Sequence, residues 1–260
     1  MVMSGGNGAR DARSGGALDG RRILVTGAAG GIGTAICRVL HRDGARLAIH
    51  YGSSREQAEA LAAEGGARSV SLQADLTSET GPGDLWNAAT EALGSIDVLI
   101  NNAGLWLPSP LEPEAEWVAG WDANMVLNLR SAAWLTRRAV LDFKSKGGGA
   151  IVSLSSRSAL RGDDADHLAY GVAKAGLQNL MKGVARAYAH LGIVAYSIAP
   201  AMVGTQMIAG HMDAEKLASL PMREVVPPED VAETVAFLAS GKARHMTGAT
   251  LDITGADYVR

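Results

Sequence analysis

Short apolar runs alternate along the chain with longer stretches in which apolar residues recur every three or four positions. The runs are rich in Ile, Leu and Val, as expected of strands that a parallel sheet buries on both faces. The stretches between them predict helices with one buried side. The strands expected from this pattern cover residues 23–26, 46–51, 69–73, 97–100, 150–154, 193–198 and 250–253.

The predicted helices cover residues 32–40, 78–93, 114–145, 168–191 and 228–240, and a further helix begins after residue 54. Ser54 and Gln57 have the spacing of a capping box, and Pro113 is well placed to open the helix that follows it. Residues 202–224 are irregular and rich in Met. The alternation of strand and helix predicts an α/β fold with a single-domain, Rossmann-like, doubly wound parallel sheet and helices on both faces.

The first twenty residues differ from the rest of the chain. They are rich in Gly, Ser and Arg and contain no apolar stretch. We therefore expect a disordered N-terminal arm over residues 1–20 and one domain over residues 21–260.

The amino-acid composition mainly excludes some classes of partner. With 47% hydrophobic and 20% charged residues and a net charge of −3, the chain has the character of an ordinary globular protein, and neither nucleic acid nor a membrane is expected as a partner. Cys37 is the single cysteine, so no intrachain disulfide can form, and a cytoplasmic location is expected. Its place on the apolar side of the first helix predicts a small buried side chain.

A glycine-rich turn joins the first strand to the first helix. Gly27, Gly31 and Gly33 lie in this turn, and Gly30 adds a fourth glycine. The N-terminus of a helix carries unpaired N–H groups and a partial positive charge, and glycine lets an anion approach the backbone. The context of strand, turn and helix therefore predicts a pyrophosphate site.

Tyr170 and Lys174 are four residues apart on a predicted helix, so they share one face of it. The fifth strand ends at Ser155 and Ser156, where side chains point into the crevice beyond the sheet. Ser156, Ser155 and Ser153 are all candidates to join the pair.

The motifs follow the order of the short-chain dehydrogenase/reductase family, and the chain resembles its 3-oxoacyl-acyl-carrier-protein reductase-like members over about residues 20–256. The resemblance implies about seven strands in the order 3-2-1-4-5-6-7. It is carried by Thr26, Gly27, Gly31, Ile32, Gly33, Asp75, Leu76, Asn101, Asn102, Ala103, Gly104, Asn128, Ser156, Tyr170, Lys174, Pro200 and Thr205.

The resemblance implies that a carbonyl and a secondary alcohol are interconverted by hydride transfer, with Tyr170 as general acid and base. A nearby ammonium lowers the pKa of a phenol, so Lys174 is expected to lower that of Tyr170 and to hold the nicotinamide ribose. Ser156 would bind the substrate oxygen, and Asn128, with Asn124 as a rival, would hold a water that resupplies protons. No metal is expected.

The family implies a nicotinamide cofactor. Its contacts would come from Gly27, Gly31, Ile32, Gly33, Tyr51, Ser53, Ser54, Arg55, Asp75, Leu76, Asn102, Ala103, Gly104, Tyr170, Lys174, Pro200, Val203 and Thr205. Tyr51 ends the second strand where an acidic residue would reject a 2′-phosphate, while His50, Ser53, Ser54 and Arg55 could bind one. This favours NADP(H), with NAD(H) as the alternative, although Gly30 stands where many NADP(H) members have an Arg. Ala201 replaces a glycine usual in the family.

We expect the substrate to be a small carbonyl or alcohol with an apolar part. The expected lining is Trp106, Leu107, Arg157, Leu160, Met202, Met207, Ile208 and Met212. By resemblance, the helices over 114–145 and 168–191 imply a homotetramer or homodimer. Two other functions remain open: a non-catalytic NAD(P)-binding regulator, and a sugar-nucleotide epimerase, for whose substrate domain the residues after the sixth strand are few.

Overall fold

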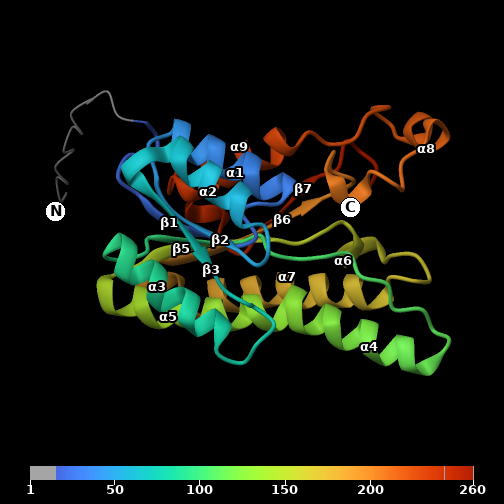
Figure 1. The fold of residues 1–260 in the computed structure, drawn as a ribbon, viewed down its shortest axis with the longest axis horizontal. Helices are drawn as coiled ribbons and strands as arrows, with labels where there is room; N and C mark the ends of the chain where they lie inside the picture. The colour runs from blue at the N-terminus through green and yellow to red at the C-terminus, as the bar shows by residue number, and fades with distance from the viewer. Residues whose placement is uncertain (1–15, 243, 260) are drawn as a thin grey trace, which may run out of the picture.

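Seven parallel strands form one sheet in the computed structural model, which describes residues 16–242 and 244–259 (Figure 1). The strand order is β3-β2-β1-β4-β5-β6-β7, as predicted. The strands are β1 (Arg22–Val25), β2 (Arg46–Tyr51), β3 (Ser69–Gln73), β4 (Val98–Asn101), β5 (Gly149–Leu154), β6 (Ile193–Pro200) and β7 (Thr250–Ile253).

Helices cover both faces of the sheet (Figure 1). On one face lie α1 (Gly31–Arg42), α2 (Arg55–Gly65) and α9 (Pro228–Ala239), and on the other lie α3 (Gly81–Leu93), α4 (Glu114–Met125), α5 (Ser131–Lys146) and α7 (Leu168–Tyr188). Two short helices, α6 (Ser158–Arg161) and α8 (Ala214–Ser219), follow β5 and β6. Short 3₁₀ turns complete the fold at Gly66–Arg68, Ala189–Leu191, Gln206–Ile208 and Arg244–Met246. In the described part of the chain, no helix is both long and apolar enough to cross a bilayer.

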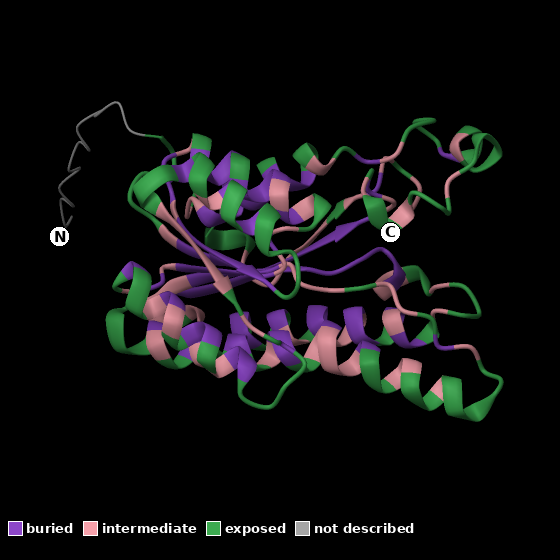
Figure 2. Ribbon diagram, viewed as in Figure 1, coloured by how far each residue is buried: buried purple, intermediate pink, exposed green. Residues whose placement is uncertain are grey.

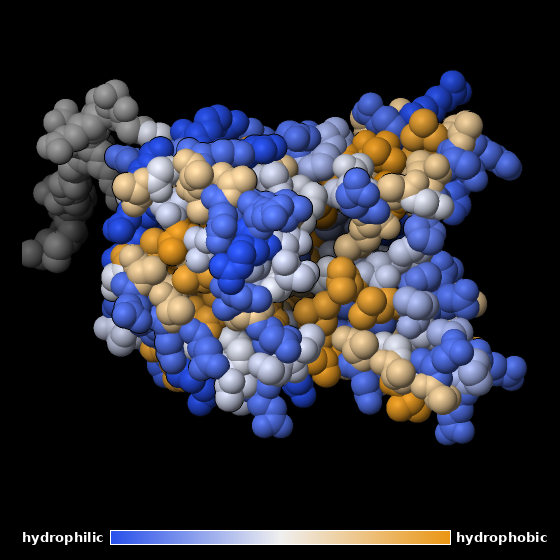
Figure 3. All heavy atoms as spheres, in the orientation of Figure 1, coloured by the Kyte–Doolittle hydropathy of each residue, from blue (hydrophilic) through white to orange (hydrophobic). Residues whose placement is uncertain are grey.

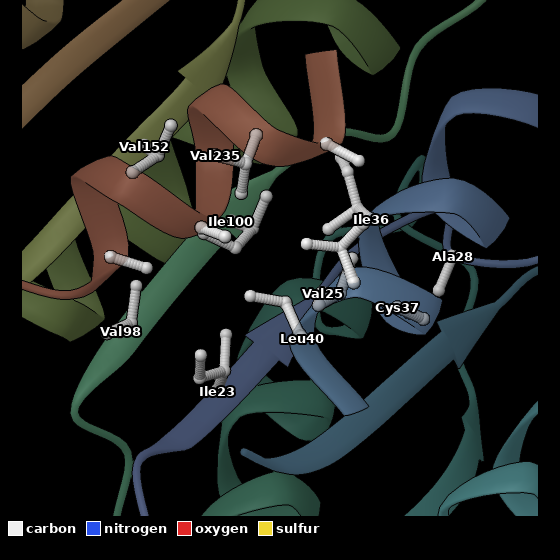
Figure 4. Close-up of a cluster of buried hydrophobic side chains, with 14 of the residues drawn as sticks. Ile23, Val25, Ala28, Ile36, Cys37, Leu40, Val98, Ile100, Val152 and Val235 are labelled. Carbon is white, nitrogen blue, oxygen red and sulfur yellow. The ribbon is translucent and has the colours of Figure 1, made fainter. Parts of the chain in front are cut away.

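The sheet separates two hydrophobic layers, and successive residues of one strand belong to different layers. Ile23 and Val25 of β1 pack with α1 and α9, whereas Leu24 packs with the helices on the other side. Buried positions fill both layers beside the sheet (Figure 2), and Figure 4 shows Ile36 and Leu40 of α1 in the first layer. Because every central strand is buried on both sides, its sequence is continuously apolar, which explains the pattern that predicted it.

The long helix predicted over residues 114–145 is divided in two. A single π turn, Val126–Arg130, joins α4 to α5 and holds Asn128. The capping box predicted at Ser54 is not formed, because Ser54 precedes α2 but makes no side-chain capping hydrogen bond.

The predicted disordered arm covers residues 1–20. Residues 1–15 lie outside the described part of the structure, so only residues 16–20 can be compared with the prediction. For Gly16–Gly20 the prediction of disorder is wrong: Leu18 is completely buried, and its N–H donates to the carbonyl of Asp43. Leu18 is a single apolar residue in a glycine-rich stretch, so no apolar periodicity predicted its burial. It packs in the hydrophobic cluster that also contains the buried residues of α1.

The central strands β1 and β4 are neighbours, and the strand order reverses between them. The crevice expected to hold a ligand lies at the carboxyl ends of these two strands. The connections after β1 and β4 turn to opposite faces, and this leaves a crevice at the carboxyl ends of the strands. The described structure thus brings the glycine-rich turn, the loop after β4 and the end of β5 to one place.

Candidate active site

A cavity of about 1070 Å³ runs along the carboxyl ends of the strands. In Figure 3 the surface is indented between the segment that carries α8 and the end of α4, and hydrophobic side chains gather beside this indentation. Sixteen of the predicted cofactor residues line the cavity: Gly27, Gly31, Ile32, Gly33, Tyr51, Ser53, Ser54, Asp75, Leu76, Asn102, Ala103, Gly104, Tyr170, Pro200, Val203 and Thr205. Arg55 and Lys174 do not line it.

The glycines of the turn are required by close backbone packing. Gly27 has a φ of +59°, and a Cβ there would lie 2.8 Å from the Cα of Ala103. A Cβ on Gly33 would lie 2.4 Å from the carbonyl oxygen of Gly27. A Cβ on Gly30 would meet only that same oxygen, at 3.5 Å, which is an ordinary contact.

The N-terminus of α1 opens into the cavity without an anion of its own. Gly30 is its N-cap and makes no side-chain capping bond, and the first turn contains no acidic residue. The free N–H groups and the positive end of the helix therefore fit the pyrophosphate of a dinucleotide.

Thr26 and Asn102 fix the turn to the loop after β4. The amide nitrogen of Asn102 donates to the carbonyl oxygens of Thr26 and Gly27, at 2.9 Å each. The Thr26 hydroxyl accepts from the backbone N–H groups of Asn102 and Ala103. Asn102 lines the cavity, but its side-chain amide is committed to shaping the turn.

His50 lies near the end of β2 and lines the cavity, but both of its ring nitrogens are bonded to backbone groups. Its Nδ1 accepts from the Gly27 N–H at 3.0 Å, so the proton lies on Nε2, which donates to the carbonyl of Ala74 at 3.1 Å. Burial lowers the pKa of His50, which keeps the ring neutral. The prediction that His50 could pair with a phosphate is wrong, because its two ring nitrogens join β2 to the turn after β1 and to the loop after β3.

The end of β2 carries no carboxylate. Tyr51 is buried, and Gly52, Ser53 and Ser54 line the cavity beyond it. The Arg55 guanidinium lies 5.8 Å from the Tyr51 ring centroid and binds Glu59 and Gln73 at the rim.

Asp75 and Leu76 line the same end of the cavity. The Asp75 carboxylate accepts from the hydroxyl and the N–H of Thr77, at 2.6 and 2.8 Å. These hydrogen bonds lower the pKa of Asp75. It is the one carboxylate among the described lining residues. It follows β3, and three strands lie between β3 and β5.

Ser156 and Tyr170 are brought together in the middle of the cavity. Ser156 follows β5, Tyr170 lies in the first turn of α7, and both line the cavity, where the Ser156 hydroxyl is near enough to the phenol to act on its pKa. Desolvation raises the pKa of Tyr170 to about 12, and Ser156 opposes that rise. The expectation of a lowered phenol pKa is therefore wrong for the described structure.

Lys174 is buried beneath this pair. Its Nζ donates to the carbonyl of Leu154 at 2.9 Å and lies 5.7 Å from the Tyr170 ring centroid. Burial lowers the pKa of Lys174 to about 8, since a low-dielectric environment disfavours the ammonium. Tyr170 and Lys174 share a helix face as predicted. However, desolvation raises the pKa of the phenol by more than a nearby ammonium lowers it.

The other two serines have neighbours of their own. The Ser155 hydroxyl donates to the carbonyl of Lys174 and accepts from Gln178, which anchors α7 on β5. Ser153 donates to the Met181 sulfur. Of the three serines, only Ser156 acts on the pKa of Tyr170.

Asn128 is buried in the π turn, and its side chain spans the backbone of Leu105. The Leu105 N–H donates to its Oδ1 at 3.0 Å, and its amide donates to the Leu105 carbonyl at 2.9 Å. Asn124 accepts a second bond from the same amide. A Cβ on Gly104 would lie 2.6 Å from the Asn128 Oδ1 and 2.9 Å from the Lys174 Nζ. Glycine at this position is what lets Asn128 and Lys174 lie behind the cavity wall.

The segment after β6 closes the cavity from the other side. Thr205 packs on the glycine-rich turn so closely that a Cβ on Gly31 would lie 2.6 Å from its Cγ2. The backbone of Ala201 is not left-handed, so alanine replaces the usual glycine there without strain.

The far end of the cavity is apolar. Of the expected substrate-lining residues, Trp106, Leu107, Met207 and Ile208 line it, whereas Arg157, Leu160, Met202 and Met212 do not. The structure adds Leu105, Leu127 and Gln206, which sequence reasoning missed. Leu105 and Leu127 flank motif residues in sequence, but only the π turn and the β4 loop reveal that they converge.

Comparisons with known proteins agree with this geometry. The family model described as enoyl-(acyl carrier protein) reductase matches residues 27–255. The chain is 36% identical to a cis-4-hydroxycyclohexanecarboxylate dehydrogenase of Sinomonas cyclohexanicum, over 90% of this chain and 95% of the relative. It is 32% identical to a 3-oxoacyl-acyl-carrier-protein reductase of Staphylococcus aureus, over 92% and 98% of the two chains.

A solved short-chain dehydrogenase from Burkholderia cenocepacia, in complex with NADP, superposes with a TM-score of 0.84. It is 31% identical and covers 92% of this chain and 98% of its own. Fold, motif order and relatives thus agree, and the chain belongs to the short-chain dehydrogenase/reductase family of NAD(P)-dependent oxidoreductases.

Proposed function

We propose that the protein is an NADP(H)-dependent oxidoreductase that interconverts a carbonyl and a secondary alcohol, with Tyr170 as the general acid and base. The observation that supports this most directly is that Ser156 and Tyr170, from β5 and α7, line the same cavity that the glycine-rich turn opens into. The Ser156 hydroxyl lies near enough to the phenol to act on its pKa, so both groups could bind one carbonyl oxygen.

In the reducing direction, Ser156 and Tyr170 orient the carbonyl by donating to its oxygen. A reduced nicotinamide, when bound, supplies the hydride that the carbonyl carbon accepts. As negative charge develops on the oxygen, Tyr170 transfers its phenolic proton there and Ser156 stabilises the charge. One hydride and one proton convert the carbonyl into the alcohol, and the phenolate takes a proton back from water.

A raised phenol pKa suits this direction, because Tyr170 carries its proton at every ordinary pH. The buried Lys174 holds a charge beside the phenolate as it forms, and Asn128 shapes the pocket behind both groups. We assign Lys174 and Asn128 as the route by which the proton is resupplied.

Replacing Tyr170 tests the proposal. Tyr170→Phe should lower kcat for ketone reduction by about 10³-fold, because the proton donor is lost, and leave NADPH affinity nearly unchanged. Nicotinamide absorbance gives the rate and fluorescence titration gives the affinity. Tyr188→Phe, at the other end of α7, is the matched control. Turnover of Tyr170→Phe at the wild-type rate would remove Tyr170 from the mechanism.

The preference for NADP(H) is supported by the end of β2, which lacks a carboxylate and has Arg55 at the rim. NADPH should bind more tightly than NADH, and Arg55→Ala should narrow the gap by about three- to tenfold. Arg38→Ala, which removes another exposed arginine bound to a glutamate, is the control. Tighter binding of NADH would favour the alternative, an NAD(H)-dependent alcohol dehydrogenase.

A homodimer or homotetramer built on the long helices completes the proposal. Exposed apolar side chains lie on α4, α5 and α7, among them Val118, Trp134, Leu141 and Val172. These helices share one face of the sheet (Figure 1). Sedimentation velocity measures the assembly, and a purely monomeric protein at micromolar concentration would contradict it.

A further inference from the structure

The substrate end of the cavity is lined by uncharged side chains. They are Leu105, Trp106, Leu107, Leu127, Gln206, Met207 and Ile208, and all but Gln206 are apolar or aromatic. None of the described lining residues is a lysine or an arginine, and the carboxylate of Asp75 lies at the opposite end. Any charged group on a substrate would therefore enter this end without an opposite charge to meet it.

Trp106 forms the most structured part of this wall. Its ring stacks on His167 with centroids 3.6 Å apart, and His211 approaches it edge-on at 5.0 Å. Its Nε1 donates to the Asp163 carboxylate at 3.3 Å. These three partners do not line the cavity, so they lie behind Trp106 and hold the ring as a fixed apolar surface.

Three basic side chains near this end are engaged elsewhere. Arg157 is buried in an ion pair with Asp257, and Lys174 donates to the Leu154 carbonyl. The His167 ring is hydrogen-bonded to Asp164. The end of α6 and the loop before α7 carry three aspartates, Asp163, Asp164 and Asp166, and one arginine, Arg161, while Lys216 is bonded to the carbonyl of His211. An anion would thus meet repulsion at the entrance and an apolar wall inside.

We propose that the substrate is an uncharged, apolar ketone or secondary alcohol whose body rests on Trp106, and that carboxylates and acidic carrier-bound acyl groups are rejected. The inference rests on the proposed function and narrows it. Burying an unpaired carboxylate is costly, whereas a neutral ring loses nothing on leaving water for this wall.

A matched pair of ketones isolates the charge. The wild-type protein is assayed with methyl 4-oxocyclohexanecarboxylate and with the free 4-oxocyclohexanecarboxylate, which share the ring and the carbonyl. With saturating NADPH, kcat/KM should be at least about 100-fold higher for the ester. Equal or better use of the acid would overturn the inference while leaving the proposed function intact. Failure to reduce the ester or any other neutral ketone, with NADPH binding retained, would overturn both.

Two lysine variants test whether the apolar lining of the substrate end causes the preference for the ester over the acid. Met207→Lys puts an ammonium at the substrate end, and should raise kcat/KM for the acid relative to the ester by at least about tenfold. Met222→Lys makes the same change at an exposed position of the same segment that does not line the cavity, and should leave the ratio unchanged. A ratio that moves equally in both variants would mean that overall charge, and not this wall, sets the preference.

Discussion

The two ends of the cavity are built in different ways. At the cofactor end the surface is mostly backbone, fixed by Thr26, Asn102 and His50 through hydrogen bonds to the glycine-rich turn. At the substrate end the surface is side chain, contributed by the loop after β4, the π turn and the segment after β6. Trp106, in the loop after β4, contacts His167 just before α7 and His211 in the segment after β6. From this difference we expect a displacement of the backbone at the cofactor end to cause a large loss of cofactor affinity. Side-chain substitutions at the substrate end should instead be tolerated and should change substrate specificity.

The largest effect is expected inside the turn. Gly33→Ala adds a methyl group 2.4 Å from the Gly27 carbonyl oxygen, so the turn must move and NADPH affinity should fall by at least about 100-fold. Gly30→Ala meets that oxygen only at 3.5 Å, so it should bind within about threefold of wild type. Fluorescence titration compares the two variants. Equal losses in both would show that the turn is not limited by backbone packing.

A second effect concerns the layer beneath the cofactor end. Leu18 is completely buried in the core that also packs α1, so Leu18→Ala should lower the free energy of unfolding by about 3 kcal/mol. Deletion of residues 1–15 should leave the melting temperature unchanged and is the control. Denaturant titration gives the first value and calorimetry the second. A Leu18→Ala protein as stable as wild type would mean that Leu18 contributes no packing.

The smallest effect is a dependence on pH. The pKa of Lys174 is about 8, so its ammonium is present below pH 8 and is lost above it, while Tyr170, with a pKa of about 12, stays protonated. If Lys174 resupplies the proton, kcat for reduction should fall about tenfold per pH unit above 8. NADPH affinity measured over the same range serves as the reference. A rate that stays flat to pH 10 would remove the ammonium from the proton route.

Much of the cofactor end could be predicted because it is local. Gly27, Gly31 and Gly33 follow a strand and begin a helix within ten residues, and the physical need for close approach limits the choice to glycine. Tyr170 and Lys174 lie one helical turn apart, so their shared face follows from helix geometry. The choice among Ser153, Ser155 and Ser156 could not be made this way, because it depends on where α7 docks against β5.

The sequence by itself determined the parallel sheet, its order by resemblance, the glycine-rich turn and the pairing of Tyr170 with Lys174, because each follows from periodicity or from residues close in the chain. Tertiary structure alone decided the burial of Leu18, the neutral His50 bridge, the raised pKa of Tyr170 and the stacking of Trp106 on His167. All four depend on desolvation or on contacts between distant segments. Such contacts exist only once the chain has folded, and no pattern along the sequence encodes how much water they exclude.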